Sequence, residues 1–199
     1  VPSIPKKEYP VPEKQPGVAK FVFVSRIVRK KNLKAAISYF KNIDGDVTFD
    51  IYGPIEDKDY WQECQDEIKL LPSNIKVNYC GLVSHDQIHE TFARYHAFLF
   101  PTFSENFGHV IAEALSVGCP VIISDQTPWK FEEECIAGYS VKLEDDIFFI
   151  KAIKNVLKMN FEKENLARKE AMDLFSKQCS LEELRIEYKK IFNGNFGGI

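Results

Sequence analysis

The stretch AFLFPTFSENFGHVIAEALSVGCPVIISD, residues 97–125, holds two short apolar runs with a helical pattern between them. The runs at residues 97–101 and 120–125 have the length and composition of buried strands, and residues 107–118 have the pattern of an apolar helix. Two parallel strands need a connection of about a dozen residues or more, which a helix supplies. The stretch therefore predicts one strand–helix–strand unit of a parallel sheet.

The same alternation extends from Lys20 to Leu143. Further strands are predicted at residues 20–27, 47–53, 75–81 and 139–143, and further helices at residues 32–43, 57–71 and 84–96. This regularity predicts an α/β fold, a Rossmann-like doubly wound parallel sheet with helices on both faces. After Leu143 the pattern is wholly helical, and extra C-terminal helices are predicted at residues 145–159, 164–178 and 180–192. We expect these helices to pack at one edge of the domain or to reach toward a neighbouring domain.

The two ends of the chain have a different composition. Residues 1–17 contain five prolines without a hydrophobic period, which is typical of an extended linker. The predicted division is therefore a linker at 1–17, one domain at 18–193 and a flexible tail at 194–199. A linker at the start, and a first residue other than methionine, predict that the chain is a piece of a longer protein with a further domain before it.

The overall composition excludes several classes of protein. The 199 residues are 45% hydrophobic and 13% aromatic, which excludes disorder, and a net charge of -3 gives no general attraction for nucleic acid. No apolar run approaches the roughly 18 residues of a membrane span, so only peripheral membrane contact of a longer protein stays open. The five cysteines are odd in number, widely spaced and without a C-x-x-C pair, which predicts reduced thiols in a cytoplasmic protein.

Polar motifs follow three of the predicted strands: SRIVRKKN at 25–32, IYGP at 51–54 and PTFSENFGH at 101–109. Ligands of open parallel sheets bind at the carboxyl ends of the strands, so these motifs are the first candidates for a site. Arg26 and Lys31 of the first motif suit a diphosphate, although a solvated basic turn is the better explanation of that motif when it is taken alone. Gly53 of the second motif indicates a turn or a close backbone approach.

The third motif leads into the helix that carries Glu113, which is the only charged residue between Asn106 and Ser124. Unpaired N–H groups at such a helix start favour an anion. An ionised carboxylate in apolar surroundings needs a donor, and the hydroxyls of a sugar would serve Glu113, with Glu105 facing the same cleft. Alternatively both acids only stabilise the helix dipole, by about 0.3–1 kcal/mol each. The residues alone leave these two interpretations open.

Other chemistry has weaker support. His85 and His89 lie four positions apart on a predicted helix, but no third ligand has suitable spacing, so no metal site is predicted. His109 is better placed as a donor at the helix start. No G-x-G-x-x-G follows a strand, and neither a Walker loop nor a G-x-S-x-G motif occurs.

Taken together, SRIVRKKN, IYGP, NYCGLVSHDQI, FPTFSENFGHVIAEALSVGCPVIISD and TPW resemble the carboxyl-terminal domain of retaining GT-B-fold glycosyltransferases, the glycosyl transferase group 1 family. The resemblance runs from about Lys20 to Phe192 and is most specific at the motif with two glutamates. One departure is Asn32, where many members have glycine after the lysine. We expect only a small local change from it.

The resemblance implies a role for each candidate residue. Arg26 and Lys31 would grip the diphosphate of a nucleoside-diphosphate sugar and stabilise its charge as it leaves, and Glu105 would contact the transferred sugar. Glu113 would accept the ribose hydroxyls. Further substrate contacts would come from Ser25, Gly53, Gly81, Leu82, Val83, Asn106, Phe107, Gly108 and His109, with the base resting near residues 81–83.

The implied reaction is sugar transfer from the nucleotide sugar to an unknown acceptor with retention, without a metal or other cofactor. The acceptor would be bound by the amino-terminal domain, so this piece alone is expected to be inactive. Two alternatives stay open, a noncatalytic nucleotide-binding module and a nucleotide-sugar isomerase of the same fold. Function depends on the site rather than on the fold, so fold alone does not separate them.

Overall fold

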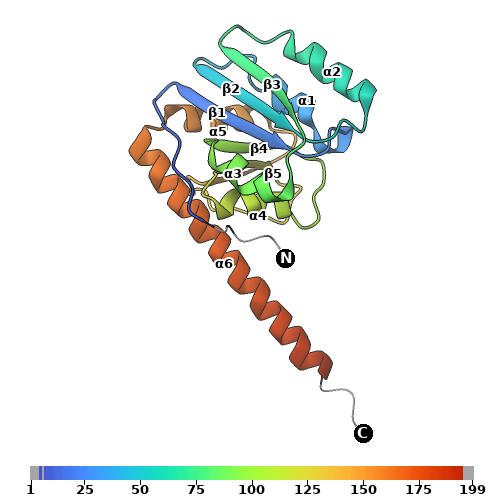
Figure 1. Cartoon of the computed structure of the whole chain (residues 1–199), viewed down its shortest axis with the longest axis vertical. Coiled ribbons are helices and arrows are strands. Elements are labelled where there is room, and N and C mark those ends of the chain that lie inside the picture. Colours follow the sequence, from blue (N-terminus) through green and yellow to red (C-terminus); the bar gives the residue numbers. More distant parts are fainter. Residues whose placement is uncertain (1–4, 6, 195–199) are drawn as a thin grey trace.

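A single parallel sheet organises the part of the chain that the computed structural model describes, residues 5 and 7–194, with side chains described as far as residue 179. Its strands lie in the order β3-β2-β1-β4-β5-β6 and pair in parallel throughout (Figure 1). They are β1 (Val18–Val24), β2 (Asp46–Tyr52), β3 (Ile75–Gly81), β4 (Ala97–Phe100), β5 (Val121–Ser124) and β6 (Gly138–Val141). This order confirms the predicted doubly wound sheet, whose direction of winding reverses between β1 and β4.

Helices cover both faces of the sheet. On one face α1 (Leu33–Ser38) packs beside α2 (Lys58–Ile68), and Tyr39 after α1 stacks on Phe149 of α5 (Asp146–Lys158) with ring centroids 4.9 Å apart. The opposite face carries α3 (Ile88–Ala93) and α4 (His109–Ser116), with α6 (Phe161–Gly194) against α4. Two short 3-10 helices, η1 (Arg29–Lys31) and η2 (His85–Gln87), precede α1 and α3. Helix α1 is shorter than predicted because residues 39–42 after it form turns, and α3 is shorter because η2 occupies the start of the predicted helix.

The central strands carry the core. Every residue of β4 and β5 is buried, which explains why their sequences are continuous apolar runs rather than alternating patterns. Phe98 and Phe100 of β4 stack on each other with ring centroids 5.2 Å apart, and Phe23 of β1 meets Phe100 edge-on. Strand β3 lies at the edge, and most of its residues are exposed or half-buried. The buried centre of the sheet therefore fixes the strand ends between β1 and β4.

The C-terminal region differs from the prediction. One helix, α6, spans Phe161–Gly194 where the sequence predicted two, and neither proline nor glycine occurs between Phe161 and Phe192 to interrupt it. Its start is capped by Asn160, whose Oδ1 accepts the backbone N–H of Lys163 at 2.9 Å. The C-terminal part of α6 extends away from the sheet (Figure 1). No helix of the described chain is long and apolar enough to cross a membrane.

The proline-rich start of the chain has no helix or strand over its described residues before Val18. It is nonetheless attached to the domain, because Lys14 is only 4% exposed and its Nζ donates to the carbonyl oxygens of Leu157 at 3.1 Å and Met159 at 2.8 Å. At the other end, Gly194 closes α6, and the remainder of the predicted tail, 195–199, lies outside the described residues.

Candidate functional site

A cleft of about 630 Å³ lies where β1 to β4 end and α4 begins. It brings together most of the residues that the sequence singled out, namely Ser25, Arg26, Lys31, Gly53, Leu82, Val83, Glu105, Asn106, Phe107, His109 and Glu113. Gly81 and Gly108 are not part of its lining. The lining further includes Val24, Lys30, Pro54, Ser84, His85, Ile88, Ser104 and Val110. Segments up to 74 positions apart in the sequence thus meet in one place.

A larger depression of about 780 Å³ lies at the opposite edge, where Gly17, Asp46 and Asn74 precede or begin strands. Its position argues against it as the main site, because open parallel sheets bind ligands at the carboxyl ends of their strands, near the point where the winding reverses. The 630 Å³ cleft occupies that position, between the ends of β1 and β4.

The turn after β1 aims Lys31 into the cleft. Residues 29–31 form η1, and Asn32 follows in the left-handed conformation with φ 57°, the only described non-glycine residue with positive φ. Asparagine tolerates this region better than most residues, and glycine tolerates it best. Asn32 therefore preserves the backbone that glycine would adopt at this position, which agrees with the small local change that was expected.

Lys31 and Glu105 form the central ion pair of the cleft. Nζ of Lys31 lies 2.8 Å from Oε2 of Glu105, and their side chains are 9% and 20% exposed. Burial works to raise the pKa of the Glu105 carboxyl, but the hydrogen bond and charge of Lys31 and the backbone N–H of Gly108 leave that pKa below its ordinary value. Glu105 is therefore ionised at neutral pH and neutralises Lys31.

The start of α4 is not as open as the sequence suggested. The N–H groups expected to be free include those of Asn106 and Gly108, and both donate to Oε1 of Glu105, at 3.1 and 3.3 Å. The alternative interpretation, an acid that stabilises a helix start, thus describes Glu105 correctly. The Glu105 carboxylate thus contacts both Lys31 and the backbone N–H groups to which an anion would bind.

Glu113 is in a different position. It lies beyond the first turn of α4, which contains no acidic residue, so the helix dipole does not account for it. Its side chain is 14% exposed and faces the cleft, where Nδ1 of His85 on the other wall approaches its Oε1 to 3.8 Å. A largely buried carboxylate in the lining of the cleft is placed to accept hydrogen bonds from a ligand there.

Arg26 is at the rim rather than beside Lys31. Its side chain is 57% exposed, and Nη1 lies 3.1 Å from Oε2 of Glu56. An ion pair this exposed contributes little to stability and leaves the guanidinium free to reorient. Phe107 is also at the rim, 72% exposed, with its ring stacked on His109 at a centroid distance of 5.6 Å.

The backbone accounts in a different way for each of the three glycines that the sequence singled out. At Gly53, φ is +138° and a Cβ would lie 1.8 Å from the carbonyl oxygen of Ser25, so the strand ends could not approach each other with a side chain there. Gly108 has φ +68° as the N-cap of α4, and a Cβ would lie 2.7 Å from Nε1 of Trp129. Gly81 has φ +77° with open space around it. Gly53 and Gly108 are therefore required by packing before any ligand is considered.

Thr102 was not singled out from the sequence, yet it connects the two halves of the cleft. It is completely buried, and its Oγ1 lies 3.2 Å from the carbonyl oxygen of Lys30 and 3.0 Å from that of Ser104. Ser124 Oγ donates to the carbonyl oxygen of Thr102. A threonine directly after an apolar run was the available signal, since a buried hydroxyl needs a partner.

His85 and His89, which were considered as metal ligands, lie in different environments. His85 is exposed and lines the cleft, whereas His89 is buried in α3. Among the described residues no group of three or more His, Cys, Asp or Glu side chains is arranged to hold a metal ion. All five cysteines lie within the described residues, and no disulfide joins any of them there.

A parallel sheet in this order, with a cleft at the reversal point, defines a doubly wound, Rossmann-like α/β domain. The domain of HepE from Anabaena, in a structure with UDP and glucose, superimposes with a TM-score of 0.71 at 18% identity over 89% of this chain and 49% of that one. TarM of Staphylococcus aureus, crystallised with UDP, gives a TM-score of 0.65 at 18% identity over 89% and 37% of the two chains. A C-terminal domain of a Francisella tularensis group 1 glycosyl transferase gives 0.64 at 18% identity over 84% and 87%.

The family is shown by the sequence. The model of the family "Glycosyl transferases group 1" matches residues 6–173, and the chain belongs to that family. The GtfA subunit of a UDP-N-acetylglucosamine–peptide N-acetylglucosaminyltransferase of Streptococcus agalactiae is 28% identical over 126 residues, 60% of this chain and 24% of that protein. The GtfA subunit of Streptococcus pneumoniae is 26% identical over 132 residues, 63% of this chain and 25% of that protein. The chain thus spans about a quarter of the length of these curated relatives.

Proposed function

We propose that this domain binds the donor of a glycosyltransferase, a nucleoside-diphosphate sugar, and contributes the groups that stabilise its departing diphosphate. The observation that carries the proposal is the pairing of opposite chemistries across one cleft. Lys31, a buried lysine of η1, lies beside the start of α4 through its ion pair with Glu105, and the carboxylate of Glu113 faces the cleft from deeper in α4. The lysine suits a diphosphate, and the carboxylate of Glu113 suits a ribose diol.

The roles follow from these positions. Lys31 and the N–H groups at the start of α4 would bind the diphosphate, with Arg26 moving in from the rim. Breaking the bond between the sugar and the diphosphate leaves negative charge on the leaving oxygen, and preorganised cations and N–H donors stabilise it where it forms. This electrostatic contribution requires no metal ion. Glu105 would contact the hydroxyls of the transferred sugar, and the base would rest against residues 81–83.

An NMR titration tests the proposal. We expect UDP, GDP or ADP, or more than one of them, to shift the backbone resonances around Lys31 and Glu113 in the full chain. Shifts confined to another region, such as the depression lined by Gly17 and Asn74, would contradict the assignment.

The role of Glu113 has its own test. Glu113→Gln should weaken a nucleoside diphosphate by roughly tenfold while inorganic pyrophosphate changes little, because only the nucleotide carries the ribose. The matched control is Glu144→Gln, an exposed acid outside the cleft, which should change neither affinity. Equal weakening of both ligands by Glu113→Gln would indicate a purely structural carboxylate.

The acceptor would be held by a separate domain of a longer protein, with transfer proceeding with retention, and the described domain would be inactive alone. Turnover by this chain above that of a Glu105→Ala variant would overturn the claim of inactivity. Cytoplasmic location is part of the same proposal and is supported by the five free thiols. A noncatalytic nucleotide-binding module is the second candidate, because the Lys31–Glu105 pair is already satisfied without a ligand.

A further inference from the structure

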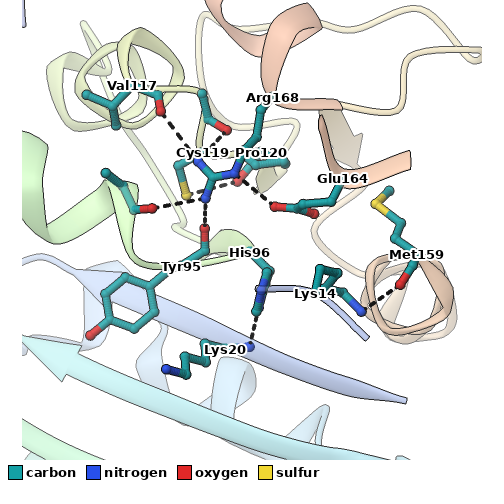
Figure 2. Close-up of polar contacts among 12 residues, drawn as sticks. Lys14, Lys20, Tyr95, His96, Val117, Cys119, Pro120, Met159, Glu164 and Arg168 are labelled. Carbon is teal, nitrogen blue, oxygen red and sulfur yellow. Dashed lines mark hydrogen bonds and ion pairs between the residues drawn. The ribbon is translucent and has the colours of Figure 1, made fainter. Parts of the chain in front are cut away.

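Arg168 of α6 lies outside the cleft but touches the ends of both helices, α3 and α4, that contribute to its two walls. The side chain is buried, with only 4% of the residue exposed. Its guanidinium donates to the carbonyl oxygens of Ala93 and Tyr95 at the end of α3, at 3.1 and 2.7 Å. It also donates to those of Val117 and Gly118 at the end of α4, at 3.5 and 3.1 Å (Figure 2). One side chain therefore joins two helix ends.

These contacts satisfy groups that helices leave unpaired. The last carbonyls of a helix have no partner within it and carry the negative end of its dipole, so a buried guanidinium between two such ends is favourable for both. The planar fork of arginine spreads five N–H donors over three nitrogens and can reach two helix ends at once, whereas an ammonium group has three donors on a single nitrogen. Gly118, in the left-handed conformation with φ +75°, allows the close approach, because a Cβ there would lie 3.1 Å from Cβ of Arg168.

The opposite ends of the same helices form the cleft. Ile88, the first residue of α3, and His85 before it line one wall, and His109 and Glu113 of α4 line the other. Both helices are short, Ile88–Ala93 and His109–Ser116, and they pack against each other. A shift of either C-terminal end is therefore transmitted along a rigid element of one to two turns to the residues of the cleft.

We propose that Arg168 is a positioning residue, which sets the distance between the wall carrying His85 and the wall carrying Glu113 by fixing the C-terminal ends of α3 and α4. It acts through these helices and does not touch the ligand. The inference rests on the proposed function, because the distance matters for the nucleoside part of a nucleoside diphosphate. The diphosphate part depends on Lys31, which is carried by η1, and on N–H groups of residues 106–108, which precede α4 and are tied to Lys31 through Glu105.

The ion pair with Glu164 limits which substitutions of Arg168 can serve as tests. Nε of Arg168 lies 3.2 Å from Oε1 of Glu164, which is fully buried, while Oε2 of Glu164 has no hydrogen-bond partner. Deleting the arginine would leave a buried carboxylate uncompensated and can prevent folding. Arg168→Lys is the better variant, because it keeps the charge beside Glu164 and loses only the fork. Arg168→Met combined with Glu164→Met is the second variant, because it removes the pair together.

The experiment measures affinity for UDP and for inorganic pyrophosphate in the full chain by calorimetry, well below the midpoint of thermal unfolding. For both variants we expect the dissociation constant of UDP to rise by roughly fivefold or more, while that of pyrophosphate changes by less than about twofold. The control is Leu157→Ala, a buried change in α5 that lowers stability without touching α3 or α4. It should leave both affinities unchanged.

The possible results distinguish a positioning role of Arg168 from a purely stabilising one. Unchanged affinities for both ligands in Arg168→Lys, or equal losses for both, would overturn the positioning role and leave Arg168 as a stabilising residue. Loss of UDP affinity in Leu157→Ala to the same extent would also overturn it. If the unaltered chain binds pyrophosphate but none of UDP, GDP or ADP, the proposed function itself fails before Arg168 is considered.

Discussion

At the scale of single residues, the main question is what Glu105 does when no ligand is bound. It neutralises Lys31 and accepts two N–H groups at the start of α4, so it already occupies the place of an anion. A phosphate that binds there must compete with this carboxylate. Without a ligand, Glu105 therefore orders the cleft. How strongly its carboxylate competes with a bound phosphate can be measured.

Glu105→Gln should bind inorganic pyrophosphate more tightly than the unaltered chain, by roughly three- to tenfold, because the competing negative charge is gone while the amide keeps a similar shape. Isothermal calorimetry at low salt provides the measurement. The control is Glu56→Gln at the exposed pair with Arg26, where solvent screening limits the change to less than about twofold. Weaker pyrophosphate binding in Glu105→Gln would show that the carboxylate organises the loop more than it competes.

The sequence singled out residues most of which meet in one cleft, but it did not indicate their partners. Lys31 and Glu105 are 74 positions apart, and nothing in their spacing shows that the ends of β1 and β4 bring them within 2.8 Å. Only the strand order places them side by side. Thr102 was missed for the same reason, since its partner, the carbonyl of Lys30, belongs to the neighbouring strand end.

At the scale of elements, the buried strands were the easiest to predict. The apolar runs at 97–101 and 120–125 became β4 and β5 almost unchanged, because strands covered on both faces need apolar side chains at every position. The helices after residue 160 were divided wrongly, because a change in polarity near Ser176 and Ser180 does not stop a helix when no glycine or proline interrupts it. The capping of α3 and α4 by Arg168 gave no signal in the sequence, since the arginine comes from a distant helix.

The N-cap of α4 offers a test of how tightly this element is built. Gly108→Ala places a Cβ 2.7 Å from Nε1 of Trp129 at a φ of +68°. The left-handed conformation costs about 1–2 kcal/mol and the overpacking about 1–3 kcal/mol of unfolding free energy. Urea denaturation followed by fluorescence gives the loss directly.

Gly81→Ala is the matched control for Gly108→Ala. Its φ is similar, +77°, but no atom lies within 4 Å of the added Cβ, so only the conformational cost of about 1–2 kcal/mol applies. The difference between the two variants therefore isolates the contact with Trp129. Equal losses of stability would mean that Trp129 moves aside without cost and that the packing under the helix start is loose.

At the scale of the whole molecule, one buried cluster joins the beginning and the end of the described chain to the sheet. Lys14 binds the end of α5, and Nδ1 of His96 accepts a hydrogen bond from the backbone N–H of Lys20 at 2.8 Å (Figure 2). Nε2 of His96 lies 3.0 Å from the carbonyl oxygen of Glu13. Glu164 and Arg168 add α6 to the same cluster. Changes of charge here should thus affect global stability.

Two groups of this cluster titrate in opposite directions. Burial raises the pKa of Glu164 to about 7 against the opposing charges of Arg168 and Lys14, and burial lowers the pKa of His96 to about 4. Between about pH 4.5 and 7 the folded chain holds a proton on Glu164 that the unfolded chain has released, so this group lowers stability as pH rises. Between about pH 4 and 6.5 the unfolded chain holds a proton on His96 that the folded chain lacks, so this group raises stability as pH rises.

Glu164 and His96 give the free energy of unfolding pH dependences of opposite sign. Replacing one of the two groups should therefore reveal the contribution of the other. In Glu164→Gln, the free energy of unfolding should rise with pH between about 4.5 and 6.5 more steeply than in the unaltered chain, by up to about 1.4 kcal/mol per pH unit. In His96→Gln it should instead fall more steeply over the same range. Guanidinium titrations at several pH values measure both, with Glu162→Gln, an exposed acid of α6, as the control. Parallel pH profiles for the unaltered chain and Glu164→Gln would mean that Glu164 stays ionised beside Arg168, and the cluster would then be a permanently charged link between α6 and the sheet.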